Sequence, residues 1–441
     1  MQLISLYIKK YNHLEEFTIE FKEKLSVIIG VNGSGKSSIL EVLAQIFSAA
    51  YLGKKTEFSF KLTYKLSDFT IIELSAADDF VVKMNNNKID NTLLPSNVVV
   101  YYSGLSDKME KLCKPHEDKQ RTDFKEDNFT QRPFFYYRPE NFKMFLLALF
   151  AFEFGDTKDF LLKKIQLTGL NSFNIDISKP KFKKITAKSD EFWGLGGVNR
   201  DFCDRLDEFS DDKVTDKPSD NFVKYDFNSI DNLYALRDYF DGEKQIFERL
   251  DMLAYEGMLS DLTILIEKKG QILNSDALSE GEKQIIAIRG INDLLINDNT
   301  LLLFDEPDTY LHPSWQGQFM EEIIKYSANA QFVITTHSPQ LLTNMNPKLG
   351  HLSYIEDGKL NNSIAHYYGR DINAILHNLM NTKERNKEID ADLTQLSKYI
   401  ALNQLTEAES LYNKLVENIG ADEPKLVAAL SEIDYFKTED E

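Results

Sequence analysis

A glycine-rich loop near the start of the chain has the composition of a phosphate-binding loop. Residues 30–37 fit the pattern G-x-x-x-x-G-K-[ST], follow an apolar run and precede a helix-like segment. Gly33 and Gly35 let backbone N–H groups turn toward phosphate oxygens, and the start of the helix adds partial positive charge. Lys36 would contact the β- and γ-phosphates of ATP, and the Ser37 hydroxyl would bind Mg²⁺. The residues expected to contact the nucleotide are Asn32, Gly33, Ser34, Gly35, Lys36, Ser37 and Ser38.

Two carboxylates follow a second apolar run. Residues 301–304 are Leu-Leu-Leu-Phe, and Asp305 and Glu306 come next. A buried strand of this kind delivers its last residues to the sheet edge at which open α/β sheets bind ligands. We therefore expect Asp305 to bind Mg²⁺ and Glu306 to orient and deprotonate the attacking water. An acidic turn after a core strand is the alternative, which the phosphate-binding loop makes the weaker one.

A histidine ends a third apolar run. Residues 331–335 predict a core strand, and His337 follows it within Thr-His-Ser-Pro. At the tip of a strand beside the carboxylate strand, a histidine can hydrogen-bond the γ-phosphate and the attacking water. We therefore predict that His337 acts with Glu306 in hydrolysis.

A serine-glycine loop begins another expected helix, at residues 278–284. Ser279 and Gly281 offer a hydroxyl and N–H groups to an anion. The chain's own phosphate-binding loop covers the near side of the nucleotide, so we expect Ser279, Gly281 and Glu282 to contact ATP held by a second subunit. A helix cap, in which Ser279 and Glu282 form a capping box, is the alternative, and both can hold at once.

Composition sets limits on the class of protein. The chain has 441 residues, which suits two or three domains, and a net charge of −19, which argues against a protein that coats DNA but permits a local basic groove. Cys113 and Cys203 lack metal-ligand spacing and predict reduced thiols. The apolar run at 144–152 is far shorter than the ~20 residues that span a bilayer. We expect a cytoplasmic protein without a membrane segment.

The order of patterns predicts an α/β fold in four parts. These are an N-terminal lobe with a β-rich subdomain (1–105), a helical, lid-like insertion (106–260), a C-terminal lobe (261–368) and an all-α module that binds a partner (369–441). Within the insertion, residues 179–188 are strongly basic, and residues 204–221 predict a mobile loop. The basic run is either a DNA-contacting segment or a solvated strand.

With these motifs in this order, the chain resembles ABC-type ATPases of the overcoming-lysogenization-defect-like (OLD-like) and RecF-like branch. The resemblance rests on residues 278–282, 305–307, 311–316 and 336–339, and it frames residues 1 to about 360. It implies an ABC-type P-loop nucleotide-binding domain that uses ATP and Mg²⁺ and forms a homodimer through its ATP sites. Asp308 departs from the family, which often has Glu there, and the shorter carboxylate puts coupling across the dimer in doubt.

The C-terminal part of the sequence resembles one particular group within this branch. Residues 368–376 and the acidic helical segments after them are similar to the PtuA family, the ATPases of Septu anti-phage defence and of some retron systems. That resemblance implies a separate HNH nuclease partner (PtuB-like) held by the C-terminal helices, DNA contacted through the complex, and a possible assembly of dimers. The stretch after His337 is too short for a toprim nuclease domain, although Asp390 and Asp392 match its Asp-x-Asp spelling.

Two other functions remain open from the sequence. One is a RecF-like repair or recombination ATPase that binds DNA directly. The other is a nucleotide-sensing scaffold partnered with a toprim nuclease. DNA binding by the isolated chain would favour the first, and ATP binding without phosphate release would favour the second.

Overall fold

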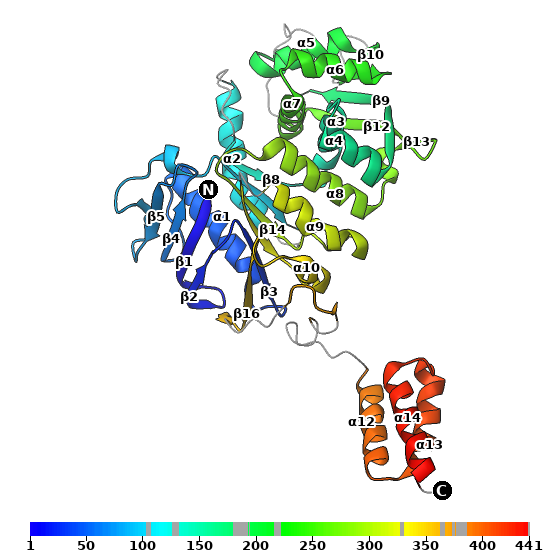
Figure 1. Ribbon diagram of the computed structural model, residues 1–441. Helices are drawn as coiled ribbons and strands as arrows, with labels where there is room; N and C mark the ends of the chain where they lie inside the picture. Colours follow the sequence, from blue (N-terminus) through cyan, green and yellow to red (C-terminus); the bar gives the residue numbers. More distant parts are fainter. Residues whose placement is uncertain are drawn as a thin grey trace. The chain divides into compact units, whose positions relative to one another are not determined.

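The computed structural model forms two compact units, Met1–Arg370 and Asp371–Glu441 (Figure 1). It describes residues 1–102, 107–125, 132–179, 193, 195–215, 222–326, 330–361, 367–372, 375 and 386–439. Nearly all of the basic run at 179–188 lies outside these residues, so both interpretations, a DNA-contacting segment and a solvated strand, stay open.

A seven-stranded sheet forms the centre of the first unit. Its strand order is β17-β16-β3-β15-β14-β7-β8, and every pair is parallel except β16 with β17. The strands are β3 (Leu25–Gly30), β7 (Asn97–Tyr102), β8 (Phe134–Tyr136), β14 (Thr300–Asp305), β15 (Ala330–Thr335), β16 (His351–Glu356) and β17 (Lys359–Asn361). Strands β14 and β15 are buried along their whole length, which is why they are continuous apolar runs. Their register places Asp305 beside Thr335 at one edge of the sheet.

Helix α1 (Lys36–Leu52) packs between the central sheet and a second sheet. It begins after Gly35, whose φ of 105° suits glycine, and it ends at Gly53 with φ 61°. The second sheet is antiparallel, with the order β2-β1-β4-β5-β6, and shares one hydrophobic core with α1. Its strands are β1 (Gln2–Tyr11), β2 (Leu14–Glu20), β4 (Phe60–Lys65), β5 (Ile71–Ala76) and β6 (Lys83–Met84). The strands within the N-terminal lobe predicted at 1–105 are thus divided between two sheets, because β3 and β7 belong to the central sheet.

The insertion at 106–260 is not only helical, contrary to our prediction. It contributes strands to a third sheet, antiparallel and ordered β10-β11-β9-β12-β13. The strands are β9 (Leu167–Ser178), β10 (Asp212–Thr215), β11 (Phe222–Phe227), β12 (Leu259–Lys268) and β13 (Gln271–Asn274). The helices are α2 (Lys108–Lys125), α3 (Asn141–Phe150), α4 (Asp156–Asp159), the π-helical η2 (Phe160–Ile165), α5 (Gly197–Phe209), α6 (Ile230–Tyr239) and α7 (Glu243–Tyr255). We call this region the lid.

The signal for the lid sheet was an alternation of apolar and polar residues. Phe173, Ile175 and Ile177 are buried on β9, and the residues between them are only partly buried. The prediction of a mobile loop at 204–221 is also wrong in part, since α5 extends to Phe209 and β10 begins at Asp212.

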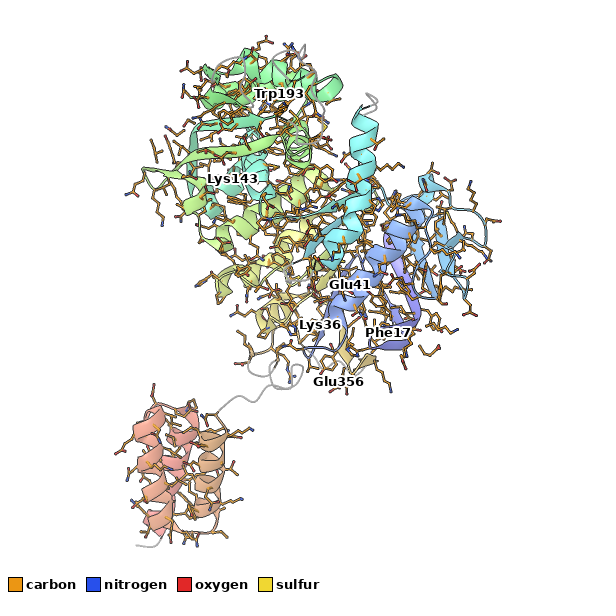
Figure 2. The ribbon with its side chains drawn as sticks, turned by 180° about the vertical axis from the view of Figure 1, so that it is seen from behind. Phe17, Lys36, Glu41, Lys143, Trp193 and Glu356 are labelled. Carbon is orange, nitrogen blue, oxygen red and sulfur yellow. The ribbon has the colours of Figure 1, made fainter. Side chains whose placement is uncertain are left out.

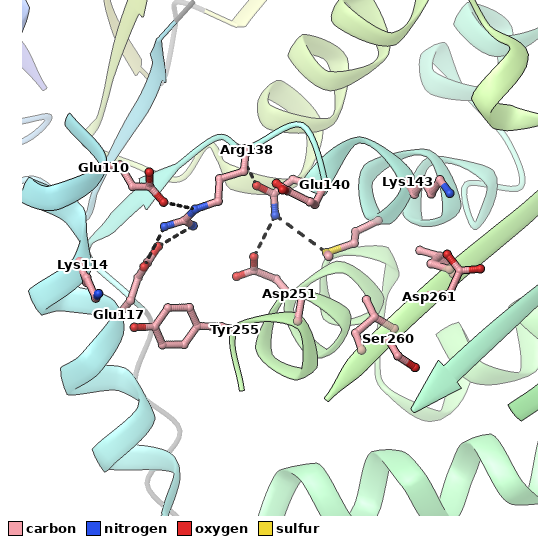
Figure 3. Close-up of a pocket in the computed structure, with 15 residues that line it drawn as sticks. Glu110, Lys114, Glu117, Arg138, Glu140, Lys143, Asp251, Tyr255, Ser260 and Asp261 are labelled. Carbon is pink, nitrogen blue, oxygen red and sulfur yellow. Dashed lines mark hydrogen bonds and ion pairs between the residues drawn. The ribbon is translucent and has the colours of Figure 1, made fainter. Parts of the chain in front are cut away.

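A buried ionic network connects the lid helices to the edge of the central sheet, beside a cavity of about 560 Å³ (Figure 3). Arg138 donates to both carboxylate oxygens of Glu117 at 2.8 and 3.0 Å, and to Glu110 at 3.0 Å. Arg132 lies 3.5 Å from Glu117 and donates to Asp251 at 2.7 Å. The network therefore joins α2, the residues on either side of β8, and α7.

The second unit has its own core. It consists of α12 (Lys387–Ala401), α13 (Leu405–Ile419) and α14 (Pro424–Glu439), so the described part of the module at 386–439 is helical. Leu393, Leu396, Leu415 and Ile433 are among the residues that meet in its centre. Asp390 and Asp392 lie on α12 rather than on a strand, so they do not form the strand-borne pair of a toprim site. Across the described residues, no helix is long and apolar enough to cross a membrane.

We predict that Glu117→Gln lowers the stability of the first unit by ~3–5 kcal/mol, because it leaves the buried Arg132 and the partly buried Arg138 without their shared carboxylate. Asp78→Asn is the control, since Asp78 is exposed and its ion pair with Lys9 should contribute less than ~1 kcal/mol. Urea unfolding followed by tryptophan fluorescence measures both. Equal, small shifts in the two variants would show that the network does not hold the lid.

Candidate functional site

The loop between β3 and α1 is built to hold an anion. Asn32 and Gly33 lie exposed at its tip, and Ser38 accepts a hydrogen bond from Asn12 at 3.3 Å. Ser34 is buried, and its Oγ has no hydrogen-bond partner among the described residues. A buried hydroxyl without a partner costs free energy unless a ligand supplies one. Together with the start of α1, this donor set fits phosphate.

Lys36 lies at the start of α1, with Glu41 further along the same helix (Figure 2). Its Nζ donates to the carbonyl oxygens of Gly30 and Val31 at 3.0 and 3.1 Å. Burial lowers the pKa of Lys36, and the carboxylates of Glu306 and Asp305 oppose that shift. The ammonium group is therefore held within the loop and close to the acidic strand end.

The Ser37 hydroxyl and the Asp305 carboxylate meet, as the Mg²⁺ prediction requires. Ser37 Oγ donates to Asp305 Oδ1 at 2.9 Å, and Thr335 Oγ1 donates to the same oxygen at 2.5 Å. Burial raises the pKa of Asp305, while the hydrogen bonds from Thr335 and Ser37 oppose the rise. A hydroxyl and a carboxylate beside a phosphate-binding loop are ligands that Mg²⁺ uses in ATPases. Sequence analysis missed Thr335, because a threonine in a core strand carries no signal of its own.

Glu306 and His337 face each other at the same sheet edge. His337 Nε2 lies 3.2 Å from Glu306 Oε1, and both side chains are more than a third exposed, so water reaches them. Burial and the positive charge of Lys36 hold the pKa of His337 below its usual value, so the imidazole is neutral at neutral pH. Glu306 has a φ of 48°, and its N–H donates to the Thr335 carbonyl at 3.0 Å. Left-handed backbone in a non-glycine residue is often found where geometry serves function.

Asp308 points into the protein rather than toward solvent. It is 5% exposed and accepts a hydrogen bond from Thr336 Oγ1 at 2.9 Å. Gln316 donates to the Asp308 carbonyl at 3.0 Å and accepts from Ser338 at 2.9 Å. Burial raises the pKa of Asp308 to about 6. The loop after β14 is thus fastened to the loop after β15.

The predicted capping box at Ser279 is present at the start of α8 (Glu280–Gly290). The Glu282 N–H donates to Ser279 Oγ at 3.4 Å, and Glu282 Oε2 accepts from the Ser279 N–H at 3.0 Å and from its hydroxyl at 2.9 Å. Lys268 also pairs with Glu282. Burial works against ionisation of Glu282, but the hydrogen bonds from Lys268 and Ser279 outweigh it and keep its pKa low. Contact of this helix start with a second subunit's ATP stays a prediction.

Gly281 allows α8 to approach the loop that follows Asp308. A Cβ atom at Gly281 would lie 2.7 Å from the Tyr310 carbonyl oxygen, closer than side chains tolerate. The Tyr310 N–H donates to Gln284 on the same helix at 3.3 Å. The Tyr310 side chain is 61% exposed. The serine-glycine loop and the loop after the carboxylate strand therefore present one continuous surface.

No group of three or more His, Cys, Asp or Glu side chains that could hold a metal occurs in the described part of the chain. A Mg²⁺ ion here would accordingly depend on Ser37, Asp305 and the oxygens of the nucleotide itself, as is usual for Mg²⁺.

The fold and the site define a P-loop ATPase. The phosphate-binding loop follows β3, the carboxylate predicted to bind Mg²⁺ ends β14, and the histidine follows β15 in the central sheet. The chain belongs to the family described as "AAA domain, putative AbiEii toxin, Type IV TA system", which matches residues 25–343.

Individual relatives agree with the resemblance seen in the sequence. The "Retron Vc95 probable ATPase" of Vibrio cholerae serotype O1 biovar El Tor is 24% identical over 375 residues, which cover 77% of this chain and 70% of the relative. The "Septu protein PtuA" of Bacillus thuringiensis is 22% identical over 339 residues, which cover 75% of this chain and 70% of the relative. The predicted resemblance to retron and Septu ATPases is thereby confirmed.

Among solved structures, the SMC head domain from Thermotoga maritima is 12% identical, with a TM-score of 0.36. The match covers 82% of this chain and 97% of that one.

We predict that Asp308→Asn stabilises the chain at alkaline but not at acidic pH. The folded-state pKa, about 6, lies above the ordinary aspartate value of 3.8, so stability is highest at low pH and falls as Asp308 ionises. The amide keeps an acceptor for Thr336 without the buried charge. The variant should therefore exceed the wild type by ~2–3 kcal/mol at about pH 8 and equal it at about pH 4. Urea midpoints across this range test the prediction, and a pH-independent difference would contradict it.

Proposed function

We propose that this chain is the ATPase subunit of an anti-phage defence complex, in which its ATP-dependent dimer controls a separate HNH nuclease that cleaves DNA. One observation carries the ATPase part: Ser37, Asp305 and Thr335 share hydrogen bonds at the sheet edge where Glu306 and His337 meet. Support for the defence role comes from the similarity to the retron ATPase and to Septu PtuA.

Each residue at this sheet edge has a separate role in the proposed hydrolysis of ATP. Lys36 and the loop N–H groups would hold the phosphates, and Ser37 with Asp305 would hold Mg²⁺, which would neutralise phosphate charge. Glu306 accepts a proton from the attacking water, and its exposure gives that water access. Neutral His337, whose Nε2 lies 3.2 Å from Glu306 Oε1, would orient the water.

The proposed dimer rests on the exposed position of Ser279 at the start of α8. Its N–H and hydroxyl donate to Glu282 in this structure, and a helix start of this kind attracts anions. Each chain supplies one phosphate-binding loop and one such helix start, so two chains related by a two-fold axis complete two sites. The exposed Tyr310 ring lies on the loop that packs against Gly281, where the second chain would cover it.

The second unit is the proposed attachment point for the nuclease. It has a core separate from that of the ATPase unit. Helix α14 exposes Val427, Leu430 and Tyr435, and exposed apolar side chains on one helix suit a protein partner. In this proposal DNA contacts the complex, pairs of dimers can assemble further, and the complex works in the cytoplasm.

We predict that Glu306→Gln slows ATP hydrolysis by ~10²–10⁴-fold while nucleotide binding persists, because only the general base is lost. ATP should then hold the variant as a stable dimer. Phosphate release and size-exclusion chromatography with light scattering measure the two effects. Wild-type hydrolysis by this variant would refute the assignment of the base, and an ATP-loaded monomer would refute the dimer.

A separate experiment tests the proposed nuclease partner, and it starts from the gene that neighbours the gene of this protein. We predict that it encodes a small HNH nuclease and that this nuclease co-purifies with the chain. Tyr435→Asp should abolish co-purification, whereas Ile272→Asp, an equally exposed apolar site on β13, should not. A toprim nuclease gene in that place would favour the nucleotide-sensing scaffold instead, and DNA binding by the isolated chain would favour the repair ATPase.

A further inference from the structure

A buried arginine lies at the far end of the helix that carries Ser279. Arg289 is the second-last residue of α8 and is 7% exposed. Its Nε donates to Asp293 Oδ2 at 2.6 Å, and its Nη2 donates to Thr157 Oγ1 at 3.1 Å. Thr157 Oγ1 in turn donates to the same Asp293 oxygen at 2.7 Å. The three groups close a hydrogen-bonded triangle, which fixes the guanidinium plane.

Two aromatic rings enclose the same guanidinium. Its carbon lies 5.3 Å from the centre of Phe160 and 5.5 Å from the centre of Tyr326, within range of cation–π attraction. Phe160 begins η2, and Tyr326 ends α9 (Pro313–Tyr326). Glu322, also on α9, lies 4.0 Å from Nη1. One side chain therefore ties together the lid, the helix that begins after Ser279, and the helix that follows the loop containing Tyr310.

The segments that meet at Arg289 depart from regular helix geometry. η2 in the lid and η4 (Ile291–Leu295), which continues α8, are both π-helical. Such wide turns are rare and concentrate at functional sites, because they shift the register of the next residues along the chain. Asp293 lies within η4, four residues after Arg289, and pairs with it. η2 leads on to β9, so the contact reaches the central strand of the lid sheet.

Contacts fix helix α8 both at its start and at its end. At its start, Gly281 and Gln284 fix the helix against Tyr310, which precedes α9 in the chain. At its end, Arg289 fixes the helix against α9 and the lid. A helix held at both ends presents its first residues in one orientation, and placement errors of about 1 Å can cost ~10²-fold in rate.

We propose that Arg289 is a positioning residue for ATP hydrolysis: through Thr157 and Asp293 it holds α8 so that Ser279 is presented to the partner's nucleotide. The inference rests on the proposed function, since it requires that Ser279 acts in the second subunit's site. Arg289 lies at the opposite end of α8 from Ser279, and its hydrogen bonds go to protein side chains rather than into the nucleotide site.

Thr157→Val is the direct test, because it removes one hydroxyl from the triangle and preserves side-chain volume. The full-length variant should bind ATP as the wild type does, while kcat falls by ~10- to 100-fold. Lys163→Met is the matched control. Lys163 belongs to the same η2 segment, but its side chain is 74% exposed and pairs only with Asp159 at 2.8 Å among the described residues, so the rate should not change. Arg289→Lys, which keeps the charge, should retain more activity than Arg289→Met.

A double variant separates positioning from simple loss of stability. If Arg289 and Thr157 act through Ser279, adding Thr157→Val to Ser279→Ala should cause no further loss of kcat. Wild-type kcat in Thr157→Val, or losses that multiply in the double variant, would overturn the proposal. Wild-type kcat in Ser279→Ala would instead show that the proposed trans site is wrong.

Discussion

The arrangement of the ATP site depends on two hydrogen bonds to one carboxylate oxygen of the buried Asp305. Asp305 Oδ1 accepts from Ser37 and from Thr335, and so joins the start of α1 to the ends of β14 and β15. A buried carboxylate is tolerated only when such donors surround it. Because β3, β14 and β15 run parallel in one sheet, their ends lie at one edge, and the groups that hold phosphate, metal and water meet there.

A second set of contacts links this edge of the sheet to α8, α9 and the lid. The loop after Glu306 is fastened inward by Asp308 and packs against α8 at Gly281. The far end of α8 is fixed to the lid and to α9 through Arg289. The ATP site, the surface proposed for the second chain and the lid are thus joined by a short series of rigid contacts. That arrangement suits the proposed control of a partner protein by the nucleotide state of this chain.

The positions of the candidate site residues could be predicted from the sequence more readily than the secondary structure of the lid, for a physical reason. Lys36, Asp305 and His337 stand in short motifs whose backbone geometry is local, and each could be placed at the end of an apolar strand. Thr335 and Arg289 depend on contacts between segments far apart in the chain, which no local pattern reveals. The lid sheet was not predicted, because its alternation of apolar and polar residues is weak. Strand β9 pairs with β11 and β12, and pairing between separate segments cannot be read from a local pattern. The helices of the second unit were found because their apolar periodicity is local.

The central claim is that each ATP site is shared between two copies of the chain, and mixing two inactive variants tests it most directly. Lys36→Ala should disable the phosphate-binding loop, and Ser279→Arg should disable the helix start proposed to face the second chain. Each variant alone should release no phosphate from ATP. When the two are mixed, a heterodimer contains one site with an intact loop from one chain and an intact Ser279 from the other, so hydrolysis should return. A mixture that stays as inactive as its components, although light scattering shows heterodimers, would contradict the account.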